Sequence, residues 1–511
     1  MALMISRAAT VYSLTQLEGN SDDEGHQHGL TTPVKGFLSA PECAVKDVEG
    51  SLLPLYRFPG QDGFLGAKRT RSFGDLYSAV PDVNAPRGLN SPALAYSSED
   101  EFGFGEASMS SGSDSMVVPQ MNQVFPQRSL LDTLLLAEWE DRAEQGLFRY
   151  DVTACPTKVV PGAYGFIAQC NEGRASKKRP TEFRVDQVSQ PFDDTKFNFT
   201  KAKQKEVLFQ LEPAPGGASP SYSAAAPAPV SPHLVLINVS PIEYGHVLLV
   251  PRVVDKIPQL VAPDTLLLAL QFAREADNPY FRLSYNSLGA YGTINHLHYQ
   301  AYYLEAPFAI ERAPTAPLAP AASCAAASAA AAAAGRGAGL GRKALSPRAG
   351  TPRRAVSIQQ LLEYPVRTLV FEAGDSLEEL ADVVGRACQR LTAANVPHNL
   401  LIADCGARVF LYPNCFAERK AKGEIPEDIL ATQVDPAGWE IAGHIVLKRQ
   451  EDYATVSQEW AWRLLSYASY PEDRFFQVAC LALGGPDHEA GDPAAAGCCG
   501  NGLGADGIDT H

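Results

Sequence analysis

The stretch that decides the fold reads Asn295-His296-Leu297-His298-Tyr299-Gln300. In an extended strand, successive side chains point to opposite faces of the sheet. Residues 296, 298 and 300 would therefore share one face, while Leu297 and Tyr299 enter the core. The pattern predicts a half-buried strand that presents two imidazoles and a carboxamide to a single surface.

Two imidazoles at this spacing are compatible with a buried structural pair, a metal site or phosphate chemistry. A metal site needs further Cys, His or carboxylate ligands. None lies nearby in the sequence, although His246 is a distant candidate. Gln300 is a poor ligand for a transition metal but a good hydrogen-bond partner for a phosphoryl oxygen. The residues therefore favour phosphate chemistry, and we expect neither a metal ion nor a cofactor.

The chain has 511 residues and a net charge of −15, from 43 basic and 58 acidic residues. This acidic balance argues against nucleic acid as a partner. No apolar run approaches the roughly 18 residues of a membrane-spanning helix, so transmembrane function is excluded. The ten cysteines include no Cys-x-x-Cys pair, and the N-terminal stretch does not resemble a secretory signal. We expect a cytoplasmic protein, with a short nuclear-import-like run at Lys177-Lys178-Arg179-Pro180.

Composition divides the chain into folded and low-complexity parts. Residues 1–128 are rich in Ser, Gly, Pro and acidic residues and predict a mostly disordered arm, because they bury too little apolar surface to offset chain entropy. Low-complexity tracts are predicted at 213–232 and 312–355, and a disordered tail at 484–511. Residues 1 to about 120 and 313–354 should then be removable without loss of turnover. One apolar island, Leu52–Phe58, either docks on the folded part or is a chance patch.

The remaining sequence predicts a mixed α/β fold. Helices are expected from Ser129, over 264–276 with Asp264 as cap, and over 377–391. Residues 442–447 echo 244–249, so we interpret 129–311 and 356–483 as two duplicated halves, each an antiparallel sheet with packed helices. Strands are expected at 165–169, 206–210, 233–238, 245–250, 281–285, 297–304, 367–371, 399–403 and 408–412.

Two motifs in the expected order resemble the histidine-triad superfamily, in the variant used by nucleotidyltransferases and phosphorylases. The His-apolar-His-apolar-Gln strand follows Asn286-Ser287-Leu288-Gly289 and Gly292-Thr293, and Ile237–Arg252 matches the superfamily's Gly-His strand. The loop 171–180 resembles the Arg-rich loop of the related hexose-1-phosphate uridylyltransferases. Further segments resemble the GDP-L-galactose phosphorylases, the plant-type enzymes of ascorbate synthesis: 138–142, 148–153, 171–174, 178–184, 196–199, 364–367, 404–406 and 443–449.

The resemblance implies that His298 is the nucleophile toward phosphorus, with its other ring nitrogen held by a backbone carbonyl near the first histidine. His296 would position and charge-balance the site, and Gln300 would bind a non-bridging phosphoryl oxygen. In the second half, residues 404–412 stand in the place of the catalytic strand, so only the first half has a nucleophile. The resemblance further implies that Asn286 and Thr293 contact the α-phosphate and that Asn238 contacts the ribose. His246 matches the Gly-His position, where it either contacts the substrate or has a structural role. Arg174 and Arg179 would bind a second anion.

The implied reaction converts GDP-L-galactose and inorganic phosphate to L-galactose 1-phosphate and GDP through a covalent guanylyl-histidine. A GDP-D-glucose phosphorylase, or an enzyme that transfers GMP to a hexose 1-phosphate, would use the same residues. A nucleotide-binding regulator without turnover is an alternative of another class, against which the intact motif argues. The expected partners are small molecules, GDP-hexose and phosphate, and a homodimer is left open.

Overall fold

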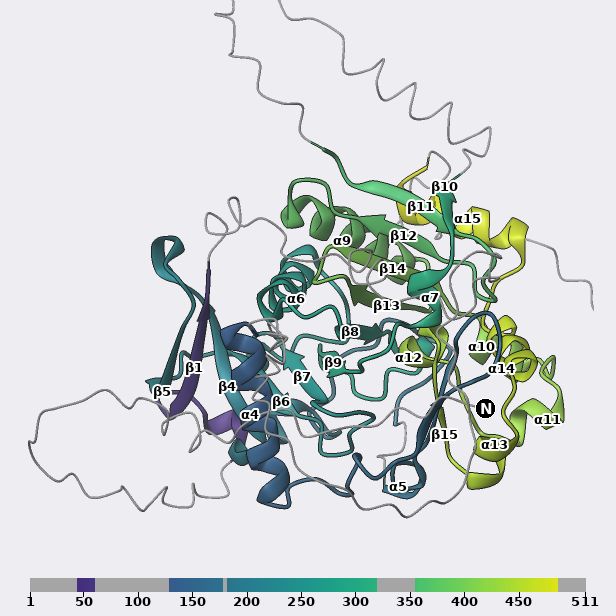
Figure 1. Cartoon of the computed structure of the whole chain (residues 1–511). Helices are drawn as coiled ribbons and strands as arrows, with labels where there is room; N and C mark the ends of the chain where they lie inside the picture. The colour runs from purple at the N-terminus through teal and green to yellow at the C-terminus, as the bar shows by residue number, and fades with distance from the viewer. Residues whose placement is uncertain (1–43, 60–127, 178–181, 319–353, 486–511) are drawn as a thin grey trace, which may run out of the picture. The chain divides into compact units, whose positions relative to one another are not determined.

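The computed structural model describes residues 44–59, 128–177, 182–318 and 354–485. Their fold is mixed α/β, as the sequence predicts, and is built on one twelve-stranded sheet (Figure 1). Its neighbouring strands are antiparallel except for the parallel pair β1 and β4. In spatial order the strands are β10 (Thr315–Pro317), β11 (Ser357–Leu361), β12 (Leu369–Glu372), β14 (Arg408–Pro413), β13 (His398–Ala403), β8 (Phe281–Asn286), β9 (Tyr299–Tyr303), β7 (Val247–Val250), β6 (His233–Ile237), β4 (Val207–Pro213), β1 (Leu52–Phe58) and β5 (Ser221–Pro227).

A second, three-stranded sheet contains β15 (His444–Leu447), β3 (Ile167–Cys170) and β2 (Thr157–Val159). Within the described ranges, no helix is long and apolar enough to cross a membrane. The α-helices are α4 (Leu130–Glu144), α5 (Glu172–Lys177), α6 (Pro263–Ala276), α7 (Ala309–Arg312), α9 (Leu377–Ala393), α10 (Phe416–Ala421), α11 (Glu427–Leu430), α12 (Gly438–Ala442), α13 (Gln450–Thr455), α14 (Gln458–Ser466) and α15 (Glu472–Leu483). The 3₁₀-helices are η1 (Val45–Asp47), η2 (Phe199–Lys201), η3 (Gln204–Glu206), η4 (Pro215–Gly217), η5 (Val253–Asp255) and η6 (Leu288–Ala290).

The helices follow from caps and apolar spacing. In α9 the fully buried Leu380, Val384 and Leu391 recur at helical spacing, so one face of the helix packs on the sheet. The predicted cap of α4 is confirmed, because Ser129 Oγ accepts the Asp132 N–H at 3.0 Å. The cap predicted for α6 is wrong. That helix starts at Pro263, and Asp264 instead accepts a hydrogen bond from Arg252 at 2.8 Å.

Hydrophobic cores lie on both faces of the sheet, because alternate side chains of each strand face opposite sides. Tyr299 and Tyr303 of β9 enter the core shared with α4, α6, α9 and α15. Tyr302, between them, enters the core on the other face, where its ring lies 4.0 Å from that of Trp439 in α12. Figure 1 shows α6 and α9 on one side of the strands and α10, α12 and α14 on the other.

The succession of elements supports an internal duplication. The order β6-β7-α6-β8-β9 is repeated as β11-β12-α9-β13-β14, and β8 pairs with β13 at the centre of the sheet. The two halves therefore share one continuous sheet, and β14 takes the place that β9 has in the first half. The predicted echo between 244–249 and 442–447 is wrong. The counterpart of β7 is β12, since residues 444–447 lie in the three-stranded sheet.

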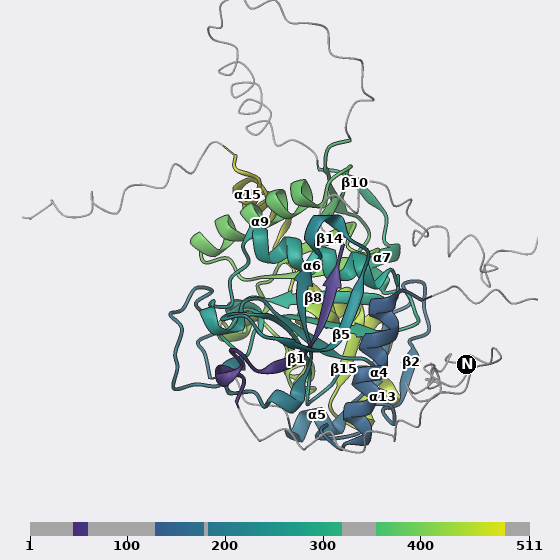
Figure 2. The same ribbon diagram turned by 90° about the vertical axis from the view of Figure 1, so that its left-hand side faces the viewer.

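The apolar island of the N-terminal arm docks on the folded part as β1. It inserts between β4 and β5, and Figure 2 shows β1 and β5 beside α4. Tyr56 is fully buried, and its hydroxyl donates to Glu275 Oε1 of α6 at 2.5 Å. Part of the predicted arm is thus an integral strand, while its residues 1–43 and 60–127 lie outside the described ranges.

Two predicted low-complexity tracts also contribute strands, which corrects the sequence analysis. Residues 221–227 of the tract 213–232 form the edge strand β5, and residues 315–317 of the tract 312–355 form β10. Ladder hydrogen bonds join backbone groups, so a strand with a formed neighbour does not require strongly apolar side chains. The rest of the second tract, 319–353, and the tail 486–511 lie outside the described residues.

Candidate active site

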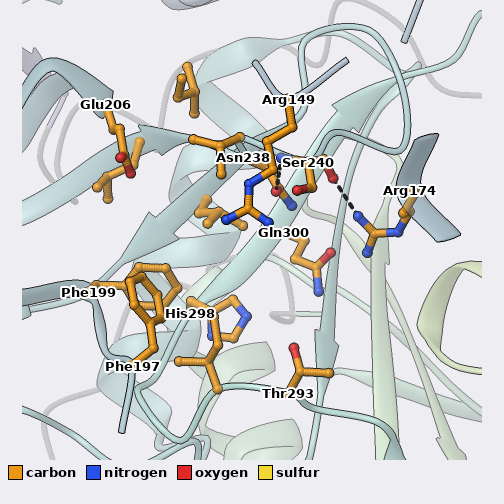
Figure 3. Close-up of a pocket in the computed structure, with 15 residues that line it drawn as sticks. Arg149, Arg174, Phe197, Phe199, Glu206, Asn238, Ser240, Thr293, His298 and Gln300 are labelled. Carbon is orange, nitrogen blue, oxygen red and sulfur yellow. Dashed lines mark hydrogen bonds between the residues drawn. The ribbon is translucent and has the colours of Figure 1, made fainter. Parts of the chain in front are cut away.

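A pocket with about 710 Å³ of empty space opens beside the ends of β6, β7 and β9 (Figure 3). In Figure 3, Phe197 and Phe199 lie on one side of His298, and Gln300 and Arg174 lie on the other. The pocket is lined by Arg149, Arg174, Phe197, Phe199, Glu206, Leu236, Ile237, Asn238, Val239, Ser240, Leu248, Thr293, Ile294, His298 and Gln300. It therefore has an aromatic and aliphatic end and a cationic, polar end.

His298 lines the pocket as a neutral imidazole with a fixed tautomer. Its Nδ1 lies 2.8 Å from the carbonyl oxygen of His296. A carbonyl only accepts, so Nδ1 carries the proton and Nε2 keeps its lone pair. Burial lowers the pKa of His298 to about 4, which keeps the ring uncharged at neutral pH. These are the properties of a nitrogen nucleophile, and they match the geometry expected for this residue.

The strand prediction is only partly right. Leu297 and Tyr299 enter the core as expected, but β9 begins at Tyr299, so His296 and His298 precede the ladder. His298 and Gln300 share the pocket, whereas His296 does not line it. The alternation of faces thus extends beyond the hydrogen-bonded strand, since the rings of His296 and His298 both lie against Phe199.

His296 instead binds the segment that carries Phe199, one of the residues that line the pocket. Its Nδ1 accepts the Phe199 N–H at 3.1 Å, and its ring lies 5.5 Å from the rings of Phe192 and Phe199. Burial lowers the pKa of His296 to about 3, which favours the neutral ring. Its position supports the segment that carries the aromatic end of the pocket.

Asn238 lines the pocket, with His246 buried beside it. The Nδ2 of Asn238 lies 3.2 Å from His246 Nε2, while its Oδ1 accepts the Ser240 N–H at 3.0 Å. His246 Nδ1 accepts the Ile242 N–H at 2.8 Å, and burial holds the pKa of His246 well below its usual value. His246 is not among the lining residues, so its position favours support of the pocket floor over direct substrate contact.

Two arginines form the cationic end of the pocket. Arg174 lies on the short helix α5, where the sequence analysis expected a loop over 171–180, and its guanidinium donates to the carbonyl of Ser240. The second is Arg149, whose backbone N–H donates to Val239 O at 2.9 Å. The sequence analysis included Arg149 in the segment 148–153 that resembles the GDP-L-galactose phosphorylases, but it did not name this arginine as a site residue. Arg179, which it did name, lies outside the described residues.

The two residues expected at the α-phosphate are placed differently. Thr293 lines the pocket. The side chain of Asn286 is turned toward the second half of the chain, where its Oδ1 accepts from Asn399 Nδ2 at 2.7 Å and from the Gly438 N–H at 2.9 Å. The structure therefore gives Asn286 a role in joining the two halves and does not bring it into the pocket.

Among the described residues, no group of three or more His, Cys, Asp or Glu side chains is arranged to hold a metal ion.

Two family models match the chain: "GDPGP1-like, N-terminal domain" over residues 130–302 and "GDPGP1-like, C-terminal domain" over residues 343–484. GDP-L-galactose phosphorylase 1 of Arabidopsis thaliana is 52% identical over 361 residues, which cover 70% of this chain and 75% of the relative. The chain belongs to the GDPGP1-like family. GDP-D-glucose phosphorylase 1 of Homo sapiens is 30% identical over 383 residues, which cover 71% of this chain and 86% of the relative. Among solved structures, yeast Ap4A phosphorylase Apa2 in complex with Ap4A aligns over 67% of this chain and 98% of its own, with a TM-score of 0.39 and 13% identity.

The two GDPGP1-like models leave residues 1–129 unmatched, yet β1 lies within that range and is buried against the first half. The pocket lies entirely within the N-terminal domain of the family, since its lining residues run from Arg149 to Gln300. In the C-terminal domain, Asn399 and Gly438 donate to the side chain of Asn286, which joins the two domains outside the pocket.

Proposed function

We propose that this protein is a GDP-L-galactose phosphorylase, which converts GDP-L-galactose and phosphate to L-galactose 1-phosphate and GDP. The observation that carries the proposal is the neutral His298, whose Nδ1 is bound to the His296 carbonyl in a pocket that also contains two arginines. Membership of the GDPGP1-like family supports the substrate class. The 52% identity to a GDP-L-galactose phosphorylase, against 30% to a GDP-D-glucose phosphorylase, favours L-galactose as the sugar.

In the first step, His298 Nε2 attacks the phosphorus of the GMP moiety. The bond from that phosphorus to the bridging oxygen breaks, and L-galactose 1-phosphate leaves as an anion that needs no proton from the enzyme. The ring then carries a positive charge, which the His296 carbonyl stabilises through Nδ1–H and the negative charge of the bound guanylyl group balances. Gln300 is placed to donate its amide hydrogens to a non-bridging oxygen as charge builds there.

In the second step, a phosphate oxygen attacks the same phosphorus and the bond to Nε2 breaks, which releases GDP and restores neutral His298. Arg149 and Arg174 can hold the incoming anion through charge-assisted hydrogen bonds. Water would need a general base, and a carboxamide at position 300 cannot supply one. Phosphate is already anionic, so this constellation favours phosphorolysis over hydrolysis.

The opposite end of the pocket suits the purine. Phe197 and Phe199 offer aromatic surface, and Glu206 is the carboxylate among the lining residues. A carboxylate can accept from both the ring N–H and the exocyclic amine of guanine, whereas adenine offers an acceptor at the equivalent ring position. The lining is thus consistent with a guanine nucleotide.

A two-stage reaction tests the proposal. The full-length protein is incubated with GDP-L-galactose alone, and the adduct is then divided between buffer and phosphate. We expect rapid release of GDP in phosphate and at least tenfold slower release of GMP in buffer. GDP-D-glucose serves as the comparison substrate. Equal rates in buffer and phosphate, or GMP as the main product, would show a hydrolase, and a clear preference for GDP-D-glucose would reassign the sugar.

The pH dependence of adduct formation follows from the pKa of His298. Because burial lowers this pKa to about 4, the imidazole stays nucleophilic well below the usual histidine pKa of about 6.5. We expect the rate of the first step, measured by rapid quench with GDP-L-galactose alone, to be nearly constant from pH 8 to about 5. An acid limb centred near pH 6.5 would contradict the buried, neutral histidine.

Thermal unfolding at each pH is the control for this experiment. A buried neutral histidine binds its proton in the unfolded chain first, so the folded state loses stability as the pH falls from about 6.5 toward 4. His296 and His298 both contribute in this direction. Rates are therefore compared only where the unfolding curve shows folded protein at the assay temperature.

A further inference from the structure

A single buried side chain, that of Gln259, forms hydrogen bonds to both the backbone N–H and the backbone carbonyl of His298. Its Oε1 accepts the His298 N–H at 3.0 Å, and its Nε2 donates to the His298 carbonyl at 3.2 Å. The same Nε2 donates to the Asn286 carbonyl at 3.1 Å. Gln259 is 1% exposed and does not line the pocket, so these contacts are made from behind the site.

The contacts are needed because His298 lies just before the ladder of β9. Pairing with β7 and β8 starts at Tyr299 and Gln300, so the peptide groups of residue 298 have no strand beside them. Buried backbone N–H and C=O groups must be paired, because an unpaired one loses its hydrogen bond to water and gains none in return. The segment that contains Gln259 supplies the partners, since the Leu297 N–H also donates to Ile257 O at 2.8 Å.

Gln259 is itself fixed at both backbone groups. Its N–H donates to Asn295 Oδ1 at 2.9 Å, and its carbonyl accepts from the Tyr285 hydroxyl at 2.6 Å. Asn295 is held in turn by Gln190 O at 3.0 Å and Pro191 O at 2.9 Å. The side-chain amide of Gln259 therefore has little freedom to move, and neither do the backbone groups of His298 to which it is bound.

We propose that Gln259 is a positioning residue that sets the orientation of His298 Nε2 toward the phosphorus. The role requires an acceptor and two donors on one side chain, which among residues of this length only glutamine provides. Displacement of a reacting group by about 1 Å can cost roughly a hundredfold in rate. The inference rests on the proposed function in naming His298 as the nucleophile.

The test compares Gln259→Met with Gln210→Met. Methionine keeps the length and burial of the side chain but none of its hydrogen bonds. Gln210 on β4 is also fully buried and does not line the pocket, and its Nε2 donates to the carbonyl of Ala226 on β5 at 3.2 Å, so this variant controls for the loss of a buried glutamine away from the site. The rate of the first step is measured per folded protein, together with KM. We expect Gln259→Met to lower this rate roughly 10- to 100-fold with KM changed less than threefold, and Gln210→Met to leave both unchanged.

The ¹⁵N spectrum of the His298 ring provides a readout that does not depend on turnover. In the wild type we expect the Nδ1-protonated pattern, and in Gln259→Met a mixture of tautomers or exchange broadening. An unchanged ring spectrum and an unchanged rate in Gln259→Met would overturn the proposal, as would an equal loss of rate in both variants. A perturbed spectrum in a protein that forms no adduct would uphold the positioning of His298 and reject the proposed function alone.

Discussion

His298→Asn is expected to reduce turnover of GDP-L-galactose to below about 1% of the wild-type rate while the protein stays folded. The Asn Nδ2 can replace Nδ1 of the imidazole as donor to the His296 carbonyl, so the local backbone keeps its contact. No atom of asparagine replaces Nε2, and the covalent step is lost. Since each tenfold is about 1.4 kcal/mol, this loss corresponds to at least about 2.8 kcal/mol of the barrier. GDP release in steady state and adduct formation in a single turnover measure it.

The matched control is His398→Asn. His398 is also fully buried, burial lowers its pKa to about 4, and its Nδ1 lies 3.0 Å from the carbonyl two residues earlier, that of Val396. It lies on β13, in the second half, and does not line the pocket. The variant should lose stability but keep its rate per folded molecule. A His298→Asn protein that turned over at more than about a hundredth of the wild-type rate would rule out the covalent mechanism.

Tyr56→Ala is expected to destabilise the protein by about 3–5 kcal/mol, the usual cost of removing a buried aromatic side chain. Tyr56 is fully buried on β1, and its hydroxyl is bound to Glu275. Because domains of this kind are stable by only about 5–15 kcal/mol, deletion of the whole of β1 should prevent folding at 37 °C. Urea unfolding followed by circular dichroism measures both effects.

Leu52→Ala serves as the control on the same strand, since Leu52 is 67% exposed and should change the free energy of unfolding by less than about 0.5 kcal/mol. The expected failure of the protein without β1 to fold reverses the expectation from composition, which treated residues 1 to about 120 as dispensable. Normal stability of a protein that lacks residues 44–59 would show that β1 contributes nothing to the fold.

The sequence by itself determined features that depend on neighbouring residues. Ser129 caps its helix because the hydroxyl and the N–H that it accepts are three residues apart. Leu297 and Tyr299 face the core and His298 and Gln300 face the pocket, because alternation of side chains is a property of extended backbone. The shared face of His298 and Gln300 was therefore predictable from local geometry, whereas their chemical roles were implied by the family resemblance.

Only the tertiary structure decided features that join distant parts of the chain. Gln259 reaches His298 across 39 residues, and Tyr56 reaches Glu275 across 219. Arg149 enters the pocket through a backbone bond to Val239, and Asn286 turns to the second half, where Asn399 and Gly438 hold it. Such contacts leave no periodic signal, because they depend on which strands become neighbours once loops close. Composition also misjudged β5, since an edge strand is held by backbone hydrogen bonds that any residue except proline can form.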